Sequence, residues 1–234
     1  VGSEMCIRDR VIAAKAKELG SPAYKVVQAG AKVLGNNKDG IDFSLEDDYY
    51  GDTRFHIPFI AWYQVMNASL ALTTMEVLKD RIPVTMEQLQ AGIANTRWQG
   101  RMETILPGVI VDGAHNEDGV RRFVETAERF QKEYPLTLLF SAVNDKDYQD
   151  MIHTICSRIK FRKVVTTEVG GYREVPSAEL AEIFCKEGCK DIGNSDNIEE
   201  AFHMAHEAKG EDGMLFCVGS LYLVGEIKTL LLKK

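Results

Sequence analysis

The chain has 234 residues, of which 45% are hydrophobic and 27% are charged, a composition typical of soluble proteins with one large domain or two smaller ones. A formal net charge of −7 argues against a general nucleic-acid-binding surface, which needs clustered Lys and Arg, and no apolar run approaches the length of a membrane span. The five cysteines, an odd number with no recognisable signal peptide, favour a reducing cytoplasm. We therefore expect neither nucleic acid nor a membrane as a partner.

The first ten residues, "VGSEMCIRDR", show no periodicity that joins them to the next segment of the chain. We expect residues 1–10 to be foreign to the fold or disordered, and we leave them out of the fold argument. A helix is predicted next, over "VIAAKAKELG", with Gly20 as its stop. The Gly-, Asn- and Asp-rich stretch from residue 30 to 59 favours short hairpins and loops.

Two further helices are predicted before residue 96. Residues 61–80 have the three-and-four spacing of one helical face, made of Trp62, Val65, Met66, Ser69, Leu70, Thr73 and Val77. Residues 85–96 form the second helix, in which Thr85 can act as the N-cap with Gln88 at the acid position of a capping box. The sequence "NTRWQGRM" then has the composition of a loop, and we place a domain boundary between residues 96 and 97.

From residue 103 onward, apolar strands alternate with amphipathic helices. The predicted strands are residues 104–112, 136–143, 162–169, a short segment at 190–195, and 213–220. The predicted helices are residues 117–134, 147–159, 177–188, 196–209 and 221–232, with Ser177 as one N-cap and Asp196 with Glu199 as a capping pair. Five strand–helix units with short connections predict a Rossmann-like α/β domain, in which helices cover both faces of a mostly parallel sheet.

Three strand exits in this domain carry unusual polar residues. They are Asp112 to Asn116, Asn144 to Asp147, and Gly219 with Ser220. The carboxyl ends of parallel strands share one edge, and each exit places a helix amino terminus there, which suits a carboxylate or phosphate. Each exit alone is better explained as a turn or a helix cap. Taken together on one edge, with His115 and Lys146 among them, they favour a ligand site.

Three of these candidates have specific chemistry. Asp112 would repel phosphate, so near a nucleotide it should accept hydrogen bonds from ribose hydroxyls or from an ammonium group. Arg101 is by composition a surface cation, but its planar fork would suit phosphate if the linker crosses a cleft. Asn67 lies within a predicted helix, where asparagine is a poor helix former, and this mild cost invites a functional explanation.

The sequence offers little support for a metal site. Cys185 and Cys189 lack the second ligand pair of a zinc site, and they are better interpreted as buried or half-exposed thiols. His203 and His206 are three residues apart on one helix, but no third ligand is evident nearby. His56 and His153 are interpreted as incidental.

Several of these segments also carry a family resemblance. The stretches "YQVMNASLAL", "NTRWQGRMETILPGVIVDGAHN", "NDKD" and "FCVGSLYLVGEIK" resemble folylpolyglutamate synthases and dihydrofolate synthases, within the Mur ligase superfamily, in order and spacing. The resemblance runs from about residue 11 to 230. It implies that residues 11–96 are the carboxy-terminal remnant of a central ATPase domain, and that residues 97–234 are the carboxy-terminal glutamate ligase domain.

The resemblance implies an ATP-dependent amide ligase. In such enzymes ATP phosphorylates a folate or dihydropteroate carboxylate, and the amine of L-glutamate attacks the acyl phosphate. By residue matching, Asn67 and Arg101 would contact ATP, Asp112 would serve both nucleotide and glutamate, and His115 and Ser220 would help to hold glutamate. Asp112 and His115 are the catalytic candidates, and Lys146 is a further candidate at a position that matches the family. A monomer is expected.

Two departures from the family pattern matter. Tyr63 stands where the family usually has histidine, and no G-x-x-x-x-G-K-[ST] phosphate loop occurs in the sequence. In the family that loop and the main Mg²⁺ ligands lie in an amino-terminal region, so we expect this chain to be a fragment that is inactive alone. Two other interpretations stay open: a Mur-type peptidoglycan amino-acid ligase, and a nucleotide-binding module without catalysis.

Overall fold

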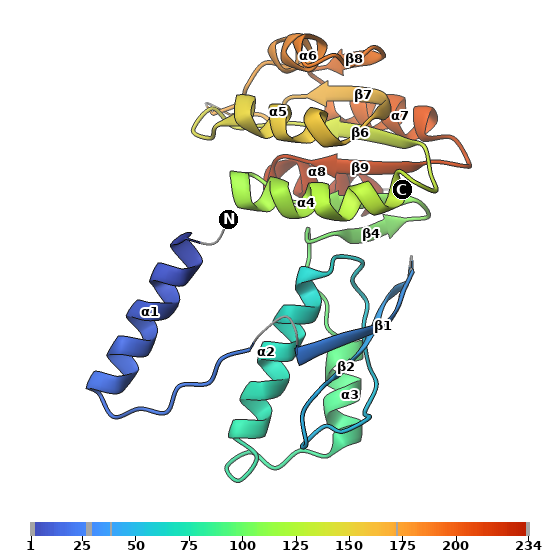
Figure 1. Ribbon diagram of the computed structural model, residues 1–234. Coiled ribbons are helices and arrows are strands. Elements are labelled where there is room, and N and C mark those ends of the chain that lie inside the picture. Colours follow the sequence, from blue (N-terminus) through green and yellow to red (C-terminus); the bar gives the residue numbers. More distant parts are fainter. Residues whose placement is uncertain (1–2, 27–29, 38, 172, 233–234) are drawn as a thin grey trace.

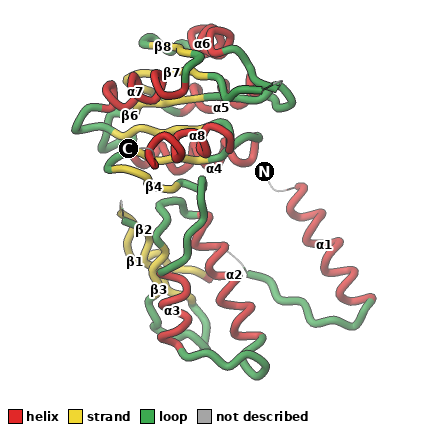
Figure 2. Tube along the Cα trace, turned by 180° about the vertical axis from the view of Figure 1, so that it is seen from behind, coloured by secondary structure: helices red, strands yellow, loops and turns green. Residues whose placement is uncertain are grey.

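The fold comes from a computed structural model, which describes residues 3–26, 30–37, 39–171 and 173–232. Helix α1 (Ser3–Glu18) stands apart from the two sheets in both views (Figures 1 and 2). It begins within the segment that we expected to be foreign or disordered, and it continues without a break into the predicted helix. The described part of residues 1–10 is therefore helical, and a foreign origin stays a prediction.

The first unit is a small antiparallel sheet with two helices. Strands β1 (Ala31–Asn37), β2 (Gly40–Leu45) and β3 (Phe55–Ile57) pair in the order β1-β2-β3. Helices α2 (Tyr63–Val77) and α3 (Met86–Ala94) pack on them around one buried apolar cluster. The capping box predicted for α3 is confirmed, because Thr85 accepts from the N–H of Gln88 while the Gln88 side chain accepts from the N–H of Thr85.

The buried face of α2 overlaps the predicted one only in part, at Val65 and Ser69. The buried residues are Gln64, Val65, Ala68, Ser69 and Leu72, whereas Leu70 and Val77 are exposed. The prediction followed the large apolar side chains. The observed face instead runs through Ala68 and Leu72, and the Ser69 hydroxyl is satisfied by donating to the carbonyl of Val65.

The second unit is a six-stranded sheet with the order β4-β5-β9-β6-β7-β8. Its strands are β4 (Glu103–Leu106), β5 (Val109–Asp112), β6 (Leu136–Phe140), β7 (Phe161–Thr167), β8 (Ile192–Ser195) and β9 (Met214–Val218). All neighbours are parallel except β4, which pairs antiparallel with β5. The predicted strand 104–112 is thus a hairpin, because Gly108, with φ of +70°, turns the chain back.

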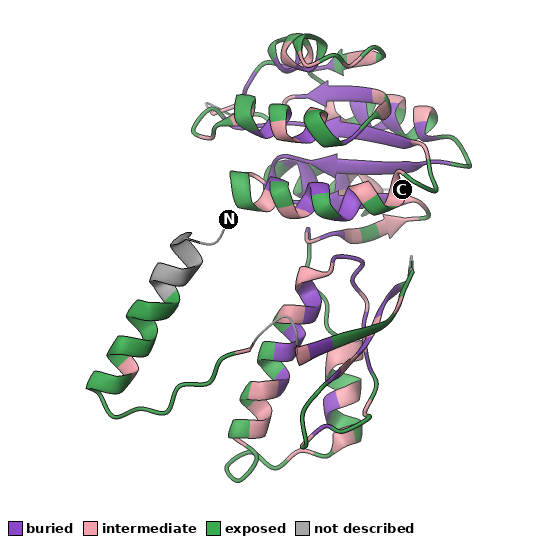
Figure 3. Cartoon of the chain, in the orientation of Figure 1, coloured by how far each residue is buried: buried purple, intermediate pink, exposed green. Residues whose placement is uncertain are grey.

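Helices cover both faces of this sheet, as predicted. They are α4 (Glu117–Phe130), α5 (Tyr148–Arg158), α6 (Ser177–Lys186), α7 (Ile198–Lys209) and α8 (Leu221–Leu232). Side chains of α4, α5 and α6 share one buried cluster, and those of α7 and α8 share the other. The central strands are buried along almost their whole length, which is the pattern of a sheet covered on both sides (Figure 3).

Two predicted helix caps are wrong by one residue. Helix α6 begins at Ser177 itself, and the hydroxyl of Thr166 donates to the carbonyl of Ser177. Helix α7 is capped by Asn197, whose side chain accepts from the N–H of Glu200, rather than by Asp196 with Glu199. At α7 two adjacent residues can cap a helix, whereas at α6 the N-cap position is taken by Pro176, which makes no side-chain cap hydrogen bond.

The two units meet at the start of α2. Ile60 and Ala61 precede this helix in the chain, yet they pack into the cluster of the six-stranded sheet, together with Met102 from the linker. The boundary predicted between residues 96 and 97 lies in the linker between α3 and β4. The domain assignment on either side of it stays a prediction.

Candidate functional site

The three polar strand exits lie at one edge of the sheet. Asp112 and Phe140, the last residues of β5 and β6, both pair in register with Val218 at the end of β9. The segments that carry His115, Lys146 and Ser220 therefore leave the sheet side by side. Contact between two exits is close, since the N–H of Ser141 donates to the carbonyl of Val218 at 3.2 Å. The structure thus brings together the exits that the sequence placed on a common edge.

Asp112 is buried, with 4% of its surface exposed. Its Oδ2 accepts from the main-chain N–H of Met102, and its Oδ1 accepts from that of Ala114, both at 2.8 Å. Burial raises the pKa of Asp112 to about 6, while the two hydrogen bonds and the charges of Arg101 and His115 act in the opposite direction. Each oxygen keeps one further acceptor site, so Asp112 can serve a ligand while it holds the main chain.

The linker turn at residues 100–102 is fixed to the exit of β5. In addition to the Met102–Asp112 bond, the carbonyl of Gly100 accepts from the N–H of Gly113 at 2.7 Å. Met102 has a φ of +47°, a left-handed conformation that costs free energy for a residue with a side chain. The turn therefore has a defined shape, and Arg101 lies between its two anchored residues.

His115 and Ser220 each make one local hydrogen bond. The Nδ1 of His115 lies 2.7 Å from the carbonyl oxygen of Gly113, which fits a tautomer that donates from Nδ1 and leaves Nε2 for another partner. The Oγ of Ser220 accepts from the N–H of Tyr222 at 3.1 Å, at the start of α8. Ser220 is buried and His115 is half-buried.

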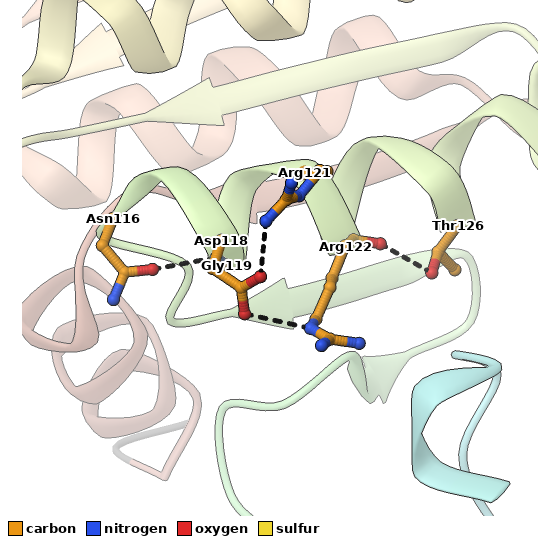
Figure 4. Close-up of polar contacts among 6 residues, drawn as sticks. All are labelled: Asn116, Asp118, Gly119, Arg121, Arg122 and Thr126. Atoms are coloured by element: carbon orange, nitrogen blue, oxygen red, sulfur yellow. Dashed lines mark hydrogen bonds and ion pairs between the residues drawn. The ribbon is translucent and has the colours of Figure 1, made fainter. Parts of the chain in front are cut away.

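The amino terminus of α4 is capped and acidic (Figure 4). Asn116 accepts from the N–H of Gly119, so one of the free donors at this helix end is already used. Asp118 binds both Arg121 and Arg122 on the outer side of the helix. With Glu117 and Asp118 in the first turn, this helix end favours an anion less than the end of α8, whose first turn has no acidic residue.

Lys146 lines an open hollow at the exit of β6. The hollow has a volume of about 390 Å³ and is formed by residues 144–149. The Lys146 side chain is half-buried, and Asp147 caps α5 by accepting from the N–H of Asp150. A loop residue that the sequence did not single out joins this exit to α8: Arg173 donates to Asp145 at 3.1 Å and to the hydroxyl of Tyr222 at 3.0 Å.

Asn67 is less closely tied to this edge than the other candidates. It is exposed on α2, and its described hydrogen bond, at 2.8 Å, goes to Gln64 in the same helix. Tyr63, one turn earlier, is closer to the site: burial raises the pKa of its hydroxyl, and the charge of Asp112 raises it further. The sequence marked Tyr63 only as a departure from the family pattern.

The side chains that could bind a metal ion are dispersed. Within the residues that the structure describes, no group of three or more His, Cys, Asp or Glu side chains could hold a metal ion. The interpretation of both cysteines as buried or half-exposed thiols is confirmed for Cys189, which is half-buried, and is wrong for Cys185, which is exposed. In the same part of the chain, no helix is both long enough and apolar enough to cross a bilayer.

Comparison with known proteins gives a consistent result. The chain is 30% identical to the dihydrofolate synthase/folylpolyglutamate synthase of Bacillus subtilis, over 80% of this chain and 43% of that protein. Among solved structures, the folylpolyglutamate synthase of Thermotoga maritima superposes with a TM-score of 0.75 at 24% identity, over 95% of this chain and 51% of that one. The folylpolyglutamate synthase of Mycobacterium tuberculosis, complexed with ADP and AMPPCP, gives 0.74 at 22% identity, over 94% and 52%.

These matches confirm both the resemblance and the α/β fold predicted from the sequence. The chain spans about half the length of these solved structures, and less than half of the Bacillus protein. The family described as Mur ligase, glutamate ligase domain, matches residues 100–221, which include Arg101, Asp112, His115, Lys146 and Ser220. Because that match covers more than half of the chain, the protein belongs to the Mur ligase family and carries its glutamate ligase domain.

Proposed function

We propose that this chain is part of an ATP-dependent amide ligase that joins L-glutamate to the carboxylate of folate or dihydropteroate. Support comes from the dihydrofolate synthase/folylpolyglutamate synthase to which it is 30% identical. The observation that carries the proposal is the buried carboxylate of Asp112, which is held by two main-chain N–H groups. Arg101 and His115 lie close enough for their charges to lower its pKa.

The charges at the edge suggest which exit takes which part of the substrates. The end of α8 has Ser220 and no acid in its first turn, so it suits a carboxylate of glutamate. His115 would add a donor or acceptor through Nε2 on the neighbouring exit. Asp112, deprotonated at neutral pH, would accept from the incoming ammonium group and orient the amine for attack.

ATP, when bound, would supply the phosphoryl group that activates the substrate carboxylate. Arg101 is the residue of this chain whose fork would hold its phosphates, and Asn67 would lie toward the adenine. Mg²⁺ ligands are expected outside this chain, so we assign no step to the metal here. The low dielectric of a buried edge would strengthen each polar contact with the substrates.

The test is glutamate-dependent ATP turnover by a longer protein that contains this chain, with dihydropteroate, tetrahydrofolate and peptidoglycan precursors as acceptors. We expect turnover with one or both pterin acceptors, and a loss corresponding to about 2–4 kcal/mol of transition-state stabilisation in Asp112→Asn. Turnover only with peptidoglycan precursors would assign a Mur-type amino-acid ligase instead. Nucleotide binding without any turnover would support the alternative of a nucleotide-binding module without catalysis.

A further inference from the structure

A carboxylate outside the strand exits is bonded to the turn that carries Arg101. Glu103, the first residue of β4, accepts through Oε2 from the N–H of Gly100 at 2.7 Å. The same side chain binds Nζ of Lys228 in α8, at 2.7 Å through Oε1 and at 3.0 Å through Oε2. These bonds form a chain of contacts from the middle of α8 to the main chain of the turn.

The turn is therefore held from two sides. On one side Asp112 and Gly113, at the exit of β5, bind Met102 and Gly100. On the other side Glu103 binds the N–H of Gly100. A left-handed Met102 persists only where its surroundings over-determine its conformation, and these bonds provide that constraint.

We propose that Glu103 and Lys228 are positioning residues that hold the turn of residues 100–102, and with it Arg101, against the exit of β5. Lys228 fixes the carboxylate of Glu103, and Glu103 fixes Gly100. The side chains of Glu103 and Lys228 are 27% and 26% exposed, so water competes less for this pair than for a surface pair. That Glu103 and Lys228 hold the turn follows from these hydrogen bonds alone, whereas a role in catalysis rests on the proposed function.

The same domain provides a matched control. Lys163 and Asp191 also form a lysine–carboxylate pair, at 2.8 Å and with a similarly protected lysine, 24% exposed. Among the described hydrogen bonds, the Asp191 side chain accepts only from Lys163. Breaking this pair removes a lysine–carboxylate pair whose carboxylate is more exposed (58%), without releasing a main-chain group of the linker.

The first experiment uses the 234-residue chain and limited trypsin digestion. Cleavage after Arg101 requires the buried Met102 to leave its hydrogen bond with Asp112, whereas the exposed Arg97 serves as an internal reference. We expect Lys228→Met and Glu103→Ala to raise cleavage after Arg101 at least tenfold relative to Arg97, and Lys163→Met to leave the ratio unchanged. The hydrogen-exchange rate of the Met102 amide should also rise in Lys228→Met and Glu103→Ala and stay unchanged in Lys163→Met.

Glu103→Gln separates charge from hydrogen bonding, because glutamine can still accept from Gly100 but no longer attracts Lys228 as a charge. We expect it to match Lys228→Met, and the double variant to add nothing to either. Equal cleavage ratios in folded wild-type and variant chains, judged by circular dichroism and thermal midpoint, would overturn the proposal. A similar rise in Lys163→Met would also overturn it, since the effect would then be general.

The second experiment addresses catalysis in a longer, active protein. Lys228→Met should raise KM for ATP several-fold more than it lowers kcat, because a displaced Arg101 weakens nucleotide binding first. An unchanged KM together with the expected proteolysis result would mean that Glu103 and Lys228 hold the turn but have no role in nucleotide binding. If no ligase activity is found in any longer protein, the proposed function fails while the proteolysis result still decides whether Glu103 and Lys228 hold the turn.

Discussion

The guanidinium carbon of Arg122 lies 5.5 Å from the centre of the Tyr63 ring, and this contact joins α4 to the first turn of α2. Arg122 also donates to Asp118 at 3.1 Å, which fixes its side chain along the helix. A small pocket of about 160 Å³ lies beside this contact, between the two units of the chain. Because the aromatic face stabilises the cation, the pair should add to the cohesion of the two units.

Replacing Arg122 tests this contact. Arg122→Ala should lower the free energy of unfolding by about 1 kcal/mol, since the cation–π contact and part of the packing are lost. Arg121→Ala is the control, because Arg121 also binds Asp118, at 2.8 Å, and its described contacts do not include Tyr63. Urea unfolding in a double-mutant cycle with Tyr63→Leu isolates the pair, and a coupling free energy near zero would show that the contact does not stabilise the chain.

The buried carboxyl group of Asp112 should make stability depend on pH. Its pKa is raised from 3.8 to about 6 in the folded chain, so between these values the folded state binds more protons than the unfolded state. Stability should therefore fall as the pH rises through this window, by about 2–3 kcal/mol from this group at about 1.4 kcal/mol per pKa unit. The measurement compares wild type with Asp112→Asn from pH 4 to 7. A difference in unfolding free energy that does not vary with pH would contradict the buried environment of Asp112.

Gly219 should not tolerate a side chain. Its φ is +111°, and an added Cβ would lie 2.0 Å from the carbonyl oxygen of Ser141, a main-chain atom that cannot move aside easily. Gly219→Ala should therefore cost about 2–4 kcal/mol through overpacking and backbone strain. Gly225→Ala, in α8, meets no atom within 4 Å and should instead stabilise by about 0.5–1 kcal/mol. Thermal unfolding of both variants decides this, and equal midpoints would contradict the close approach of the two strand exits.

The chain alone should not turn over ATP. Phosphoryl transfer needs a cradle of main-chain N–H groups, a lysine on the terminal phosphates and a held Mg²⁺. The sequence has no phosphate-loop motif that would supply the first two. We expect the purified chain to show no magnesium-dependent phosphate release above a heat-inactivated control. Robust phosphate release would show that this chain itself contains the residues needed for phosphoryl transfer, contrary to our proposal.

The parallel sheet was predictable because the patterns that indicate its strands and helices lie within short stretches of sequence. Alternating strands and helices gave the topology class, and the buried face of α4 (Val120, Phe123, Val124 and Ala127, with Phe130 half-buried) is the one that helical spacing predicts. The strand exits could be placed on one edge for the same reason. The face of α2 could be predicted only in part, at Val65 and Ser69. It is set by contacts with a sheet formed by other segments, and residues such as Gln64 and Ala68 carry little apolar signal in a sequence.

The role of Asp112 in the fold was also outside the reach of sequence patterns. Both of its oxygens bind main-chain N–H groups, one of them ten residues earlier in the chain. A main-chain donor leaves no mark in the sequence, and neither does the left-handed φ of Met102. Glu103 and Lys228 are 125 residues apart, and nothing in their local sequence indicates that they meet. The residue types of the candidate site were therefore predictable, while the bonds that position them were not.

The position of β9 has a consequence for the synthesis of the chain. Among the described strands β9 is the last in sequence, yet it lies between β5 and β6 and pairs with both. During translation the two halves of this sheet cannot pair until residues 214–218 have been made, so the nascent domain keeps two apolar strand edges exposed up to that point. A chain released before residue 214 would carry two unpaired apolar strand edges, which are sites for aggregation or for pairing with another chain.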